Sequence, residues 1–269
     1  MIADVLNVYG SEVAPTKKSA RQIGYCITHL LEFWGDKTAA EISAKACREY
    51  VAPRAPAAAG ADLKVLKAAV MHWHQEYGPL TFIPSFWRPS GNPPKERWLT
   101  KSEAARLLWA ARRDQHIKRM ILLGLHTGSR PGVLLALRWD QVDLRGKVLS
   151  RTPINEIEDK HKRAPKVMLG RKIMGHLRRW KRMDGPIEHV CHLEGRQVGD
   201  PHGSWRRIVK AAGLTGITRH TLRHTRATWM MRAGVSIWDA AGFLGMTIKT
   251  LEKVYAHHDP KHMDKAANI

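Results

Sequence analysis

Residues near the C-terminus carry side chains that suit chemistry on a phosphodiester. In the segment His220-Thr-Leu-Arg223-His224, a helix would place His220 and Arg223 on one face, because residues three apart are neighbours on a helix. A guanidinium offers a planar fork to two phosphate oxygens, and an imidazole can move a proton near neutral pH. The structural alternative is an exposed basic helix face, and this pair alone leaves both interpretations open.

The same histidines allow a second chemistry. His220 and His224 have the i, i+4 spacing of two zinc ligands, and with His257 and His258 they would suit a metal-dependent nuclease or hydrolase. The segment around His220 offers no carboxylate or cysteine as a third ligand. We therefore expect no metal and no other cofactor, and sensitivity to a chelator would distinguish the two readings.

The overall charge indicates a polyanionic partner. The chain has 45 Lys+Arg against 24 Asp+Glu, a net charge of +21, of which +18 lies in residues 96–269. Double-stranded DNA is the first candidate, although a ribosomal protein or a membrane-surface binder would also be basic. Three cysteines without a CxxC spacing argue against a disulfide framework. With no secretory signal and no run of 18 apolar residues, we expect no membrane association and a cytoplasmic location.

The sequence predicts two domains. Three prolines and a glycine within residues 87–95 interrupt any helix, so we assign a linker to 91–96 between domains 1–90 and 97–269. The first domain is predicted to be a helical bundle that binds DNA. Its predicted helices contain the apolar stripe from Ile23 to Trp34, a segment opened by the capping box Thr38–Glu41, and the stripe from Leu63 to Trp73. Its candidate phosphate contacts, which could equally form a solvated face, are Lys17, Lys18, Arg21, Lys64 and Lys67.

The second domain is predicted to be mainly α with a small antiparallel β-sheet. A capping box at Thr100–Glu103 opens a helix, and a following helix ends near residues 126–130. Alternating segments at 147–150 and 166–169 read as strands around a basic turn. From Arg171 onward the pattern predicts helices broken at Gly185, Gly195, Gly213, Gly234 and Gly245.

Four segments in this domain resemble the tyrosine recombinases, the phage-integrase family. His126-Thr-Gly-Ser-Arg130 followed by Leu134-Leu-Ala-Leu-Arg-Trp139 is similar to the first arginine box of the family. The basic turn from Lys160 to Arg163, leading into Val167-Met-Leu169, resembles the strand turn with a catalytic lysine. The His220–His224 segment comes next, and Leu244-Gly-Met246 with Tyr255 nine residues later is similar to the nucleophile segment. The N-terminal bundle matches the family's core-binding domain in type and position.

This resemblance implies a site-specific recombinase or integrase that cuts and rejoins DNA through a 3′-phosphotyrosine intermediate. Tyr255 would attack the scissile phosphate, Arg130 and Arg223 would hold its nonbridging oxygens, and His220 would be the acid/base partner on the tyrosine side. Lys160 would protonate the leaving 5′ oxygen, with Lys162 and Arg163 as neighbouring DNA contacts. The resemblance further implies integration or excision of a phage or mobile element, a homotetramer on DNA, an accessory DNA-bending or directionality protein, and action at the bacterial nucleoid.

Two residues depart from the family pattern. Val133 stands where many relatives have a glutamate, and Met246 stands where the family commonly has His or Trp, so Met246 is at most a positioning or packing residue. These departures are the basis of an alternative, a catalytically impaired DNA-binding regulator. A type IB topoisomerase shares the chemistry, but the two-domain layout favours a recombinase.

Overall fold

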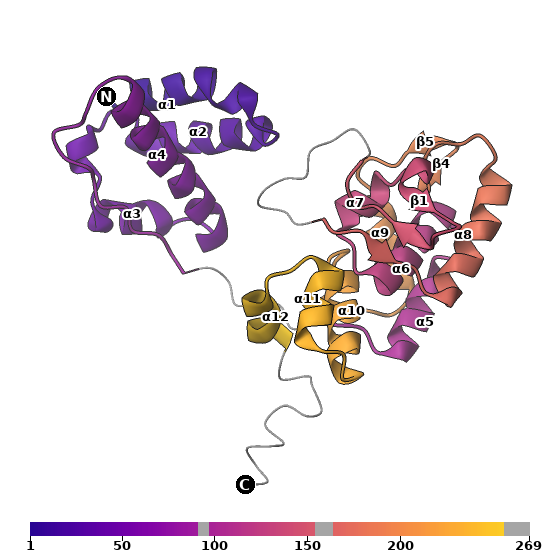
Figure 1. The fold of residues 1–269 in the computed structure, drawn as a ribbon. Coiled ribbons are helices and arrows are strands. Elements are labelled where there is room, and N and C mark those ends of the chain that lie inside the picture. The colour runs from indigo at the N-terminus through magenta and orange to yellow at the C-terminus, as the bar shows by residue number, and fades with distance from the viewer. Residues whose placement is uncertain (91–96, 154–163, 256–269) are drawn as a thin grey trace, which may run out of the picture. The chain divides into compact units, whose positions relative to one another are not determined.

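A computed structural model of the chain describes residues 1–90, 97–153 and 164–255 (Figure 1). The chain divides into two compact units, Met1–Pro93 and Pro94–Ile269. The predicted linker 91–96 lies outside the described residues. None of the helices in the described ranges combines the length and apolar character that crossing a bilayer needs.

The first unit is a helical bundle. Its helices are α1 (Ile2–Glu12), α2 (Ala20–Trp34), α3 (Ala44–Val51) and α4 (Pro56–Glu76). The long α4 packs against α1, α2 and α3, and the side chains buried between them include Leu6, Leu30, Cys47 and Leu66. Apolar residues recur at helical spacing in α2 and α4, which is why these helices pair through one face.

Two expectations for this unit need correction. The capping box at Thr38–Glu41 exists, but it opens only the 3₁₀ turn Ala39–Glu41 instead of a second helix. Ile42 is extended, and Ser43 then caps α3 by accepting a hydrogen bond from the Ala46 amide. The stronger N-cap therefore lies five residues downstream. The helix α1 was not predicted.

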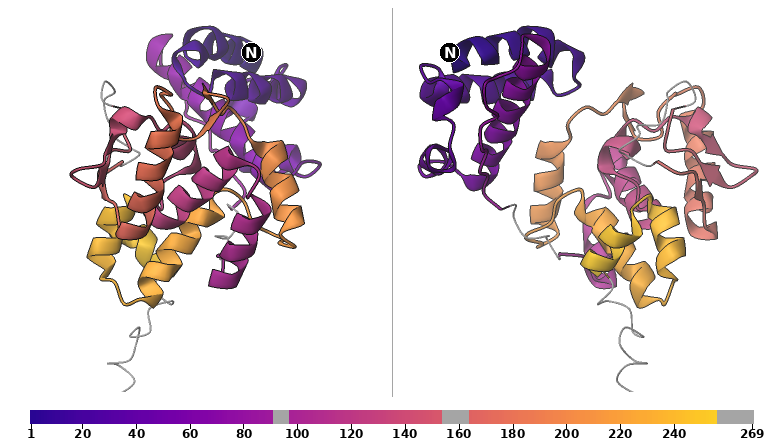
Figure 2. Two further views of the ribbon diagram at one scale, coloured as in Figure 1. Left: turned by 90° about the vertical axis from the view of Figure 1, so that its right-hand side faces the viewer. Right: turned by 60° about the vertical axis from the view of Figure 1, so that its left-hand side comes forward.

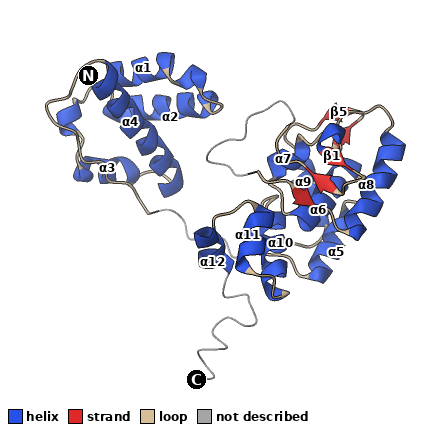
Figure 3. Cartoon of the chain, in the orientation of Figure 1, coloured by secondary structure: helices blue, strands red, loops and turns tan. Residues whose placement is uncertain are grey.

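The second unit is mainly helical with a small sheet, as Figure 3 shows in blue and red. Its helices are α5 (Lys101–Ala110), α6 (Gln115–Thr127), α7 (Pro131–Leu135), α8 (Arg171–Asp184), α9 (His202–Ala211), α10 (Thr221–Arg232), α11 (Ile237–Leu244) and α12 (Ile248–Tyr255). The strands β1 (Val142–Asp143), β2 (Val148–Leu149) and β3 (Val167–Met168) form one antiparallel sheet in the order β1-β2-β3. The predicted fold class is confirmed.

The structure confirms several of the helix boundaries that were predicted for this unit from capping boxes and glycines. The Thr100–Glu103 capping box opens α5, and glycines follow the ends of α8, α10 and α11. Gly195 does not break a helix, because it lies in the turn between β4 (His192–Leu193) and β5 (Arg196–Gln197). The strand pair predicted at 147–150 and 166–169 is the β2–β3 pair, whereas β1 was not predicted.

The last three helices form a small cluster of their own. The helices α10, α11 and α12 contact one another, as the orange-to-yellow ribbons of Figure 2 show, and α10 also packs along α6. Their shared apolar core includes Ala227, Met231, Leu244, Leu251 and Tyr255. This packing places Tyr255, at the end of α12, against α10, the helix that carries Arg223 and His224.

Candidate functional site

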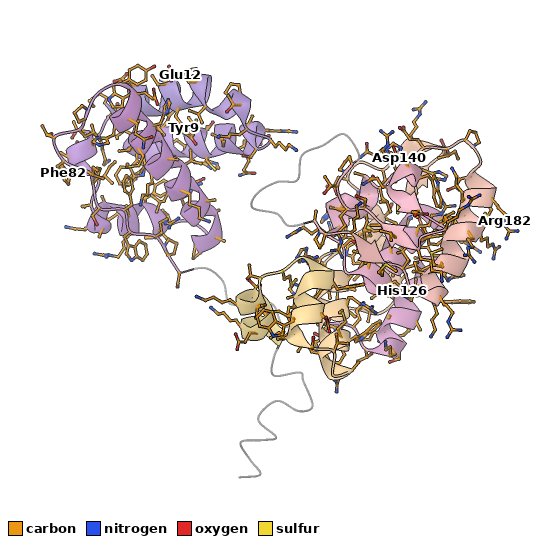
Figure 4. All side chains as sticks on the ribbon, viewed as in Figure 1. Tyr9, Glu12, Phe82, His126, Asp140 and Arg182 are labelled. Atoms are coloured by element: carbon orange, nitrogen blue, oxygen red, sulfur yellow. The ribbon has the colours of Figure 1, made fainter. Side chains whose placement is uncertain are left out.

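The segment that carries Arg130 is shaped by a helix end and a proline. The helix α6 ends at Thr127, next to His126 (labelled in Figure 4), and Gly128 follows with φ of 63° in the left-handed region. A side chain at position 128 would collide with the Leu244 side chain, so the glycine also allows α11 to approach. Arg130 is then the N-cap of α7, with Pro131 at the first helical position.

Arg223 ties two helix ends together. Its Nη1 donates to the Gly128 carbonyl oxygen at 2.8 Å, and its Nη2 donates to the Gly245 carbonyl oxygen at 3.4 Å. These glycines end α6 and α11, where helix carbonyls carry partial negative charge, so they suit a cation. Arg223 is only 2% exposed. The alternative of an exposed basic helix face is therefore wrong for Arg223.

Arg223 and Arg130 are two positive charges that affect the pKa values of their neighbours in the site. Burial, together with the charge of Arg130, lowers the pKa of Arg223 to about 10, which leaves it protonated at neutral pH. Partial desolvation and the charges of Arg223 and Arg130 also lower the pKa of His220, the residue just before α10. Arg130, His220 and Arg223 therefore lie close enough to share one electrostatic environment. Such a cluster of positive charge suits a phosphate group.

Tyr255 is the last residue of α12, and its side chain faces α10. It is 3% exposed, and its hydroxyl is hydrogen-bonded to Nδ1 of His224. Burial raises the pKa of Tyr255 to about 12, although the charge of Arg223 acts in the opposite direction. The structure thus brings Tyr255 together with the histidine–arginine segment, although 31 residues separate it from His224 in the sequence.

Two functional residues were missed by sequence reasoning. His224 was considered only as a zinc ligand, and its one signal was the i, i+4 spacing from His220. The other is Arg151, a lone arginine after β2 that no sequence pattern singles out. Arg151 is 4% exposed, and its guanidinium donates to Ser129 Oγ (2.8 Å) and to the carbonyl oxygens of Thr127 (2.6 Å) and Phe243 (2.8 Å).

Arg151 supports the segment that carries Arg130. It holds both residues that flank Gly128, and it links them to the end of α11 through Phe243. Burial, with the charges of Arg223 and Arg130, lowers the pKa of Arg151 to about 9. Val133 has no carboxylate that could hold Arg130, whereas Arg151 holds the backbone segment just before Arg130 through Thr127 and Ser129.

We expect Arg151→Met to destabilise the protein by about 2 to 4 kcal/mol, because buried acceptors would lose their donor. Urea denaturation followed by circular dichroism measures this change. The control Arg138→Met removes an arginine whose ion pairs with Asp140 and Glu188 are about half exposed, so its expected cost is below about 1 kcal/mol. Equal stability of Arg151→Met and wild type would show that the bonds of Arg151 contribute nothing.

The remaining predicted residues fall into three groups. Met246 is half-buried, packs against the cluster of α10, α11 and α12, and lines a hollow of about 590 Å³ with Trp238 and Ile248, which fits a packing role. Lys160, Lys162 and Arg163 lie outside the described residues, as do His257 and His258. Among the described residues, no three His, Cys, Asp or Glu side chains gather as metal ligands. The five basic residues proposed as phosphate contacts in the first unit are exposed: Lys17, Lys18 and Arg21 lie around the start of α2, and Lys64 and Lys67 lie on α4.

Comparison with known proteins identifies the family. The model described as the phage integrase family matches residues 97–262. The integrase of Salmonella phage P22 is 27% identical over 230 residues, which cover 80% of this chain and 57% of that protein. The tyrosine recombinase XerA of Pyrococcus furiosus is 27% identical over 172 residues, which cover 62% of this chain and 59% of that protein. The chain thus spans less than two thirds of the length of these curated relatives.

Solved structures show the same fold. The Tn1549 transposon integrase in complex with transposon right-end DNA has a TM-score of 0.80 at 15% identity, with 99% of each chain covered. The lambda integrase dimer bound to a COC′ core site has a TM-score of 0.68 at 18% identity, with 94% of this chain and 76% of that chain covered. Because the family model matches more than half of the chain, the protein belongs to the phage integrase family of tyrosine recombinases.

Proposed function

We propose that this protein is a site-specific DNA recombinase that cuts and rejoins DNA through a 3′-phosphotyrosine intermediate. The observation that carries the proposal is the convergence of a tyrosine hydroxyl, two histidines and two arginines from α12, α10 and the start of α7. A tyrosine nucleophile conserves the energy of the phosphodiester, so the strands can be rejoined without ATP.

Each residue has a role in the proposed reaction. The Tyr255 oxygen attacks the scissile phosphorus, and the bond from phosphorus to the 5′ oxygen breaks. Arg130 and Arg223 hold the nonbridging oxygens, where negative charge grows in the transition state. Lys160 gives a proton to the leaving 5′ oxygen. Because the pKa of Tyr255 is raised to about 12, forming the phenolate at pH 7 would cost about 7 kcal/mol, so a proton acceptor is needed.

The DNA contacts extend beyond this site. We assign phosphate contacts to Lys17, Lys18, Arg21, Lys64 and Lys67 in domain 1–90, because all five are exposed, and to Lys162 and Arg163 in domain 97–269. Phosphate contacts position a protein on DNA without reading its sequence. The wider proposal includes a homotetramer on DNA, an accessory DNA-bending or directionality protein, and integration or excision of a phage or mobile element at the bacterial nucleoid.

Covalent trapping tests the proposal. The full chain is incubated with nicked suicide duplexes that cover candidate attachment sites, with and without a chelator, and then denatured. We expect a denaturation-resistant protein–DNA adduct in both conditions and a free 5′ hydroxyl on the released strand. Specific binding without an adduct would favour the DNA-binding regulator, and cleavage that a chelator abolishes would favour a metal-dependent nuclease.

A further inference from the structure

The Tyr255 hydroxyl is hydrogen-bonded to His224. The family resemblance instead implied that His220 is the acid/base partner of the tyrosine. Within the described residues, the side chain hydrogen-bonded to this hydroxyl is His224, through Nδ1, with the two rings 5.9 Å apart between centroids. His220 in turn contacts His224, with the two rings edge-to-face and 5.3 Å between their centroids. The order of the three side chains is therefore Tyr255, His224, His220.

The fold fixes this order. His224, Ala227 and Met231 have the spacing of one helix face, and Ala227 and Met231 are buried in the cluster that also contains Leu251 and Tyr255. The face of α10 that carries His224 therefore packs against α12. His220, the N-cap of α10, is a full helical turn further from this contact.

His224 is held in the form that can accept a proton. The titratable or charged groups around it are Tyr255 of α12 and His220 and Arg223 of the α10 segment. Arg130, just before α7, acts in turn on His220 and Arg223. Burial, together with the charges of His220 and Arg223, lowers the pKa of His224 to about 4. At neutral pH the ring is uncharged, and with its proton on Nε2 the Nδ1 nitrogen of His224 accepts the hydrogen bond that the Tyr255 hydroxyl donates.

We propose that His224 is the residue that takes the proton of Tyr255 during DNA cleavage and returns it during rejoining. This inference rests on the proposed function. As the Tyr255 oxygen bonds to phosphorus, its O–H bond breaks and an N–H bond forms at Nδ1 of His224. The leaving 5′ oxygen receives its proton from a separate acid. In the reverse step the Nδ1 proton goes back to the tyrosine oxygen as the phosphotyrosine bond breaks. His220 then remains available to donate to the phosphate.

The test measures single-turnover cleavage of a suicide duplex that wild type converts to a covalent adduct. The variants are His224→Ala and His224→Asn, because asparagine can accept a hydrogen bond from Tyr255 but cannot take its proton. We expect both to slow cleavage by about 10²- to 10⁴-fold, the usual contribution of a general base. The control is His176→Gln on an exposed position of α8, which should cleave like wild type. Recovery of the wild-type rate by His224→Asn would overturn the proposal and leave a positioning role only.

A second substrate separates the two ends of the reaction. A duplex with sulfur in place of the bridging 5′ oxygen has a leaving group that needs no proton, so it should restore cleavage to Lys160→Ala. It should not restore cleavage to His224→Ala, because the tyrosine still has to lose its proton. Restoration of His224→Ala by the sulfur substrate would overturn the proposal by placing His224 on the leaving-group side.

The pH dependence of the cleavage rate distinguishes a proton acceptor from a residue with a purely structural role, because loss of a structural residue would leave this dependence unchanged. With a neutral acceptor in place, wild-type cleavage of the sulfur substrate should change little between pH 6 and 8. In His224→Ala the tyrosine must ionise by itself, so the rate should rise about tenfold per pH unit. A flat profile in a folded, DNA-binding His224→Ala would overturn the proposal. If wild type itself forms no adduct, the proposed function fails first, and this inference fails with it.

Discussion

Replacing Tyr255 by phenylalanine should abolish the covalent protein–DNA adduct while leaving DNA binding intact. Phenylalanine keeps the ring that packs among α10, α11 and α12 but lacks the oxygen that would bond to phosphorus. The buried His224 nitrogen loses its hydrogen-bond donor, so we expect a stability loss of only about 1 to 2 kcal/mol. Denaturing electrophoresis of the trapped complex measures the adduct, and a gel-shift assay measures binding.

The matched control for this prediction is Tyr77→Phe in the first unit. Tyr77 donates its hydroxyl proton to Glu12, far along the chain from the proposed chemistry, and about half of its side chain is exposed. This variant should form the adduct at the wild-type rate. An adduct that persists in Tyr255→Phe would mean that a different side chain is the nucleophile, and peptide mapping of the adduct would then identify that side chain.

Local signals predicted the fold of the second unit well, because its helix boundaries depend on neighbouring residues. The Thr100–Glu103 capping box supplies acceptors for the free amides at the start of α5, and this needs only four residues. The Thr38–Glu41 pair has the same spacing, but the Thr38 hydroxyl donates to the Glu41 carboxylate, and the chain turns away after one 3₁₀ turn. A capping box therefore predicts a turn start reliably, while the length of the helix depends on the residues that follow.

The site itself could be predicted only in part. The types and order of Arg130, His220, Arg223 and Tyr255 were visible in the sequence, and the structure places the last three around the start of α10 and the end of α12. The hydrogen bond between Tyr255 and His224 depends on how α12 packs on α10, which no spacing rule encodes. The role of Arg151 was equally hidden, because all three of its partners are distant in sequence.

The hydrogen bonds that hold the two buried arginines of the site have a common physical basis. Arg151 and Arg223 donate to four backbone carbonyls at the ends of α6 and α11: Thr127, Gly128, Phe243 and Gly245. Helix C-termini carry partial negative charge, so they stabilise the cations without neutralising them completely. A phosphate entering this site would therefore meet positive charge that is already in position, which is the requirement for electrostatic stabilisation of a transition state.

The largest effect expected from a conservative change follows from this arrangement. Arg223→Lys keeps the positive charge but loses the planar fork that can bond two carbonyls and a phosphate at once. We expect adduct formation at saturating DNA to slow by about 10²- to 10³-fold, the usual cost of removing one preorganised donor. The control Arg232→Lys changes an exposed arginine at the end of the same helix and should cleave at the wild-type rate.

Because Arg223 also supports the ends of α6 and α11, a slow variant could simply be a distorted one, and a chemical test separates the two causes. A duplex with a methyl group in place of one nonbridging oxygen develops less negative charge at the scissile phosphate, so it depends less on a guanidinium. If Arg223 stabilises that charge, the rate difference between wild type and Arg223→Lys should shrink on this substrate. If the variant is only distorted, the difference should stay the same on both substrates, and Arg223 would then be a structural residue.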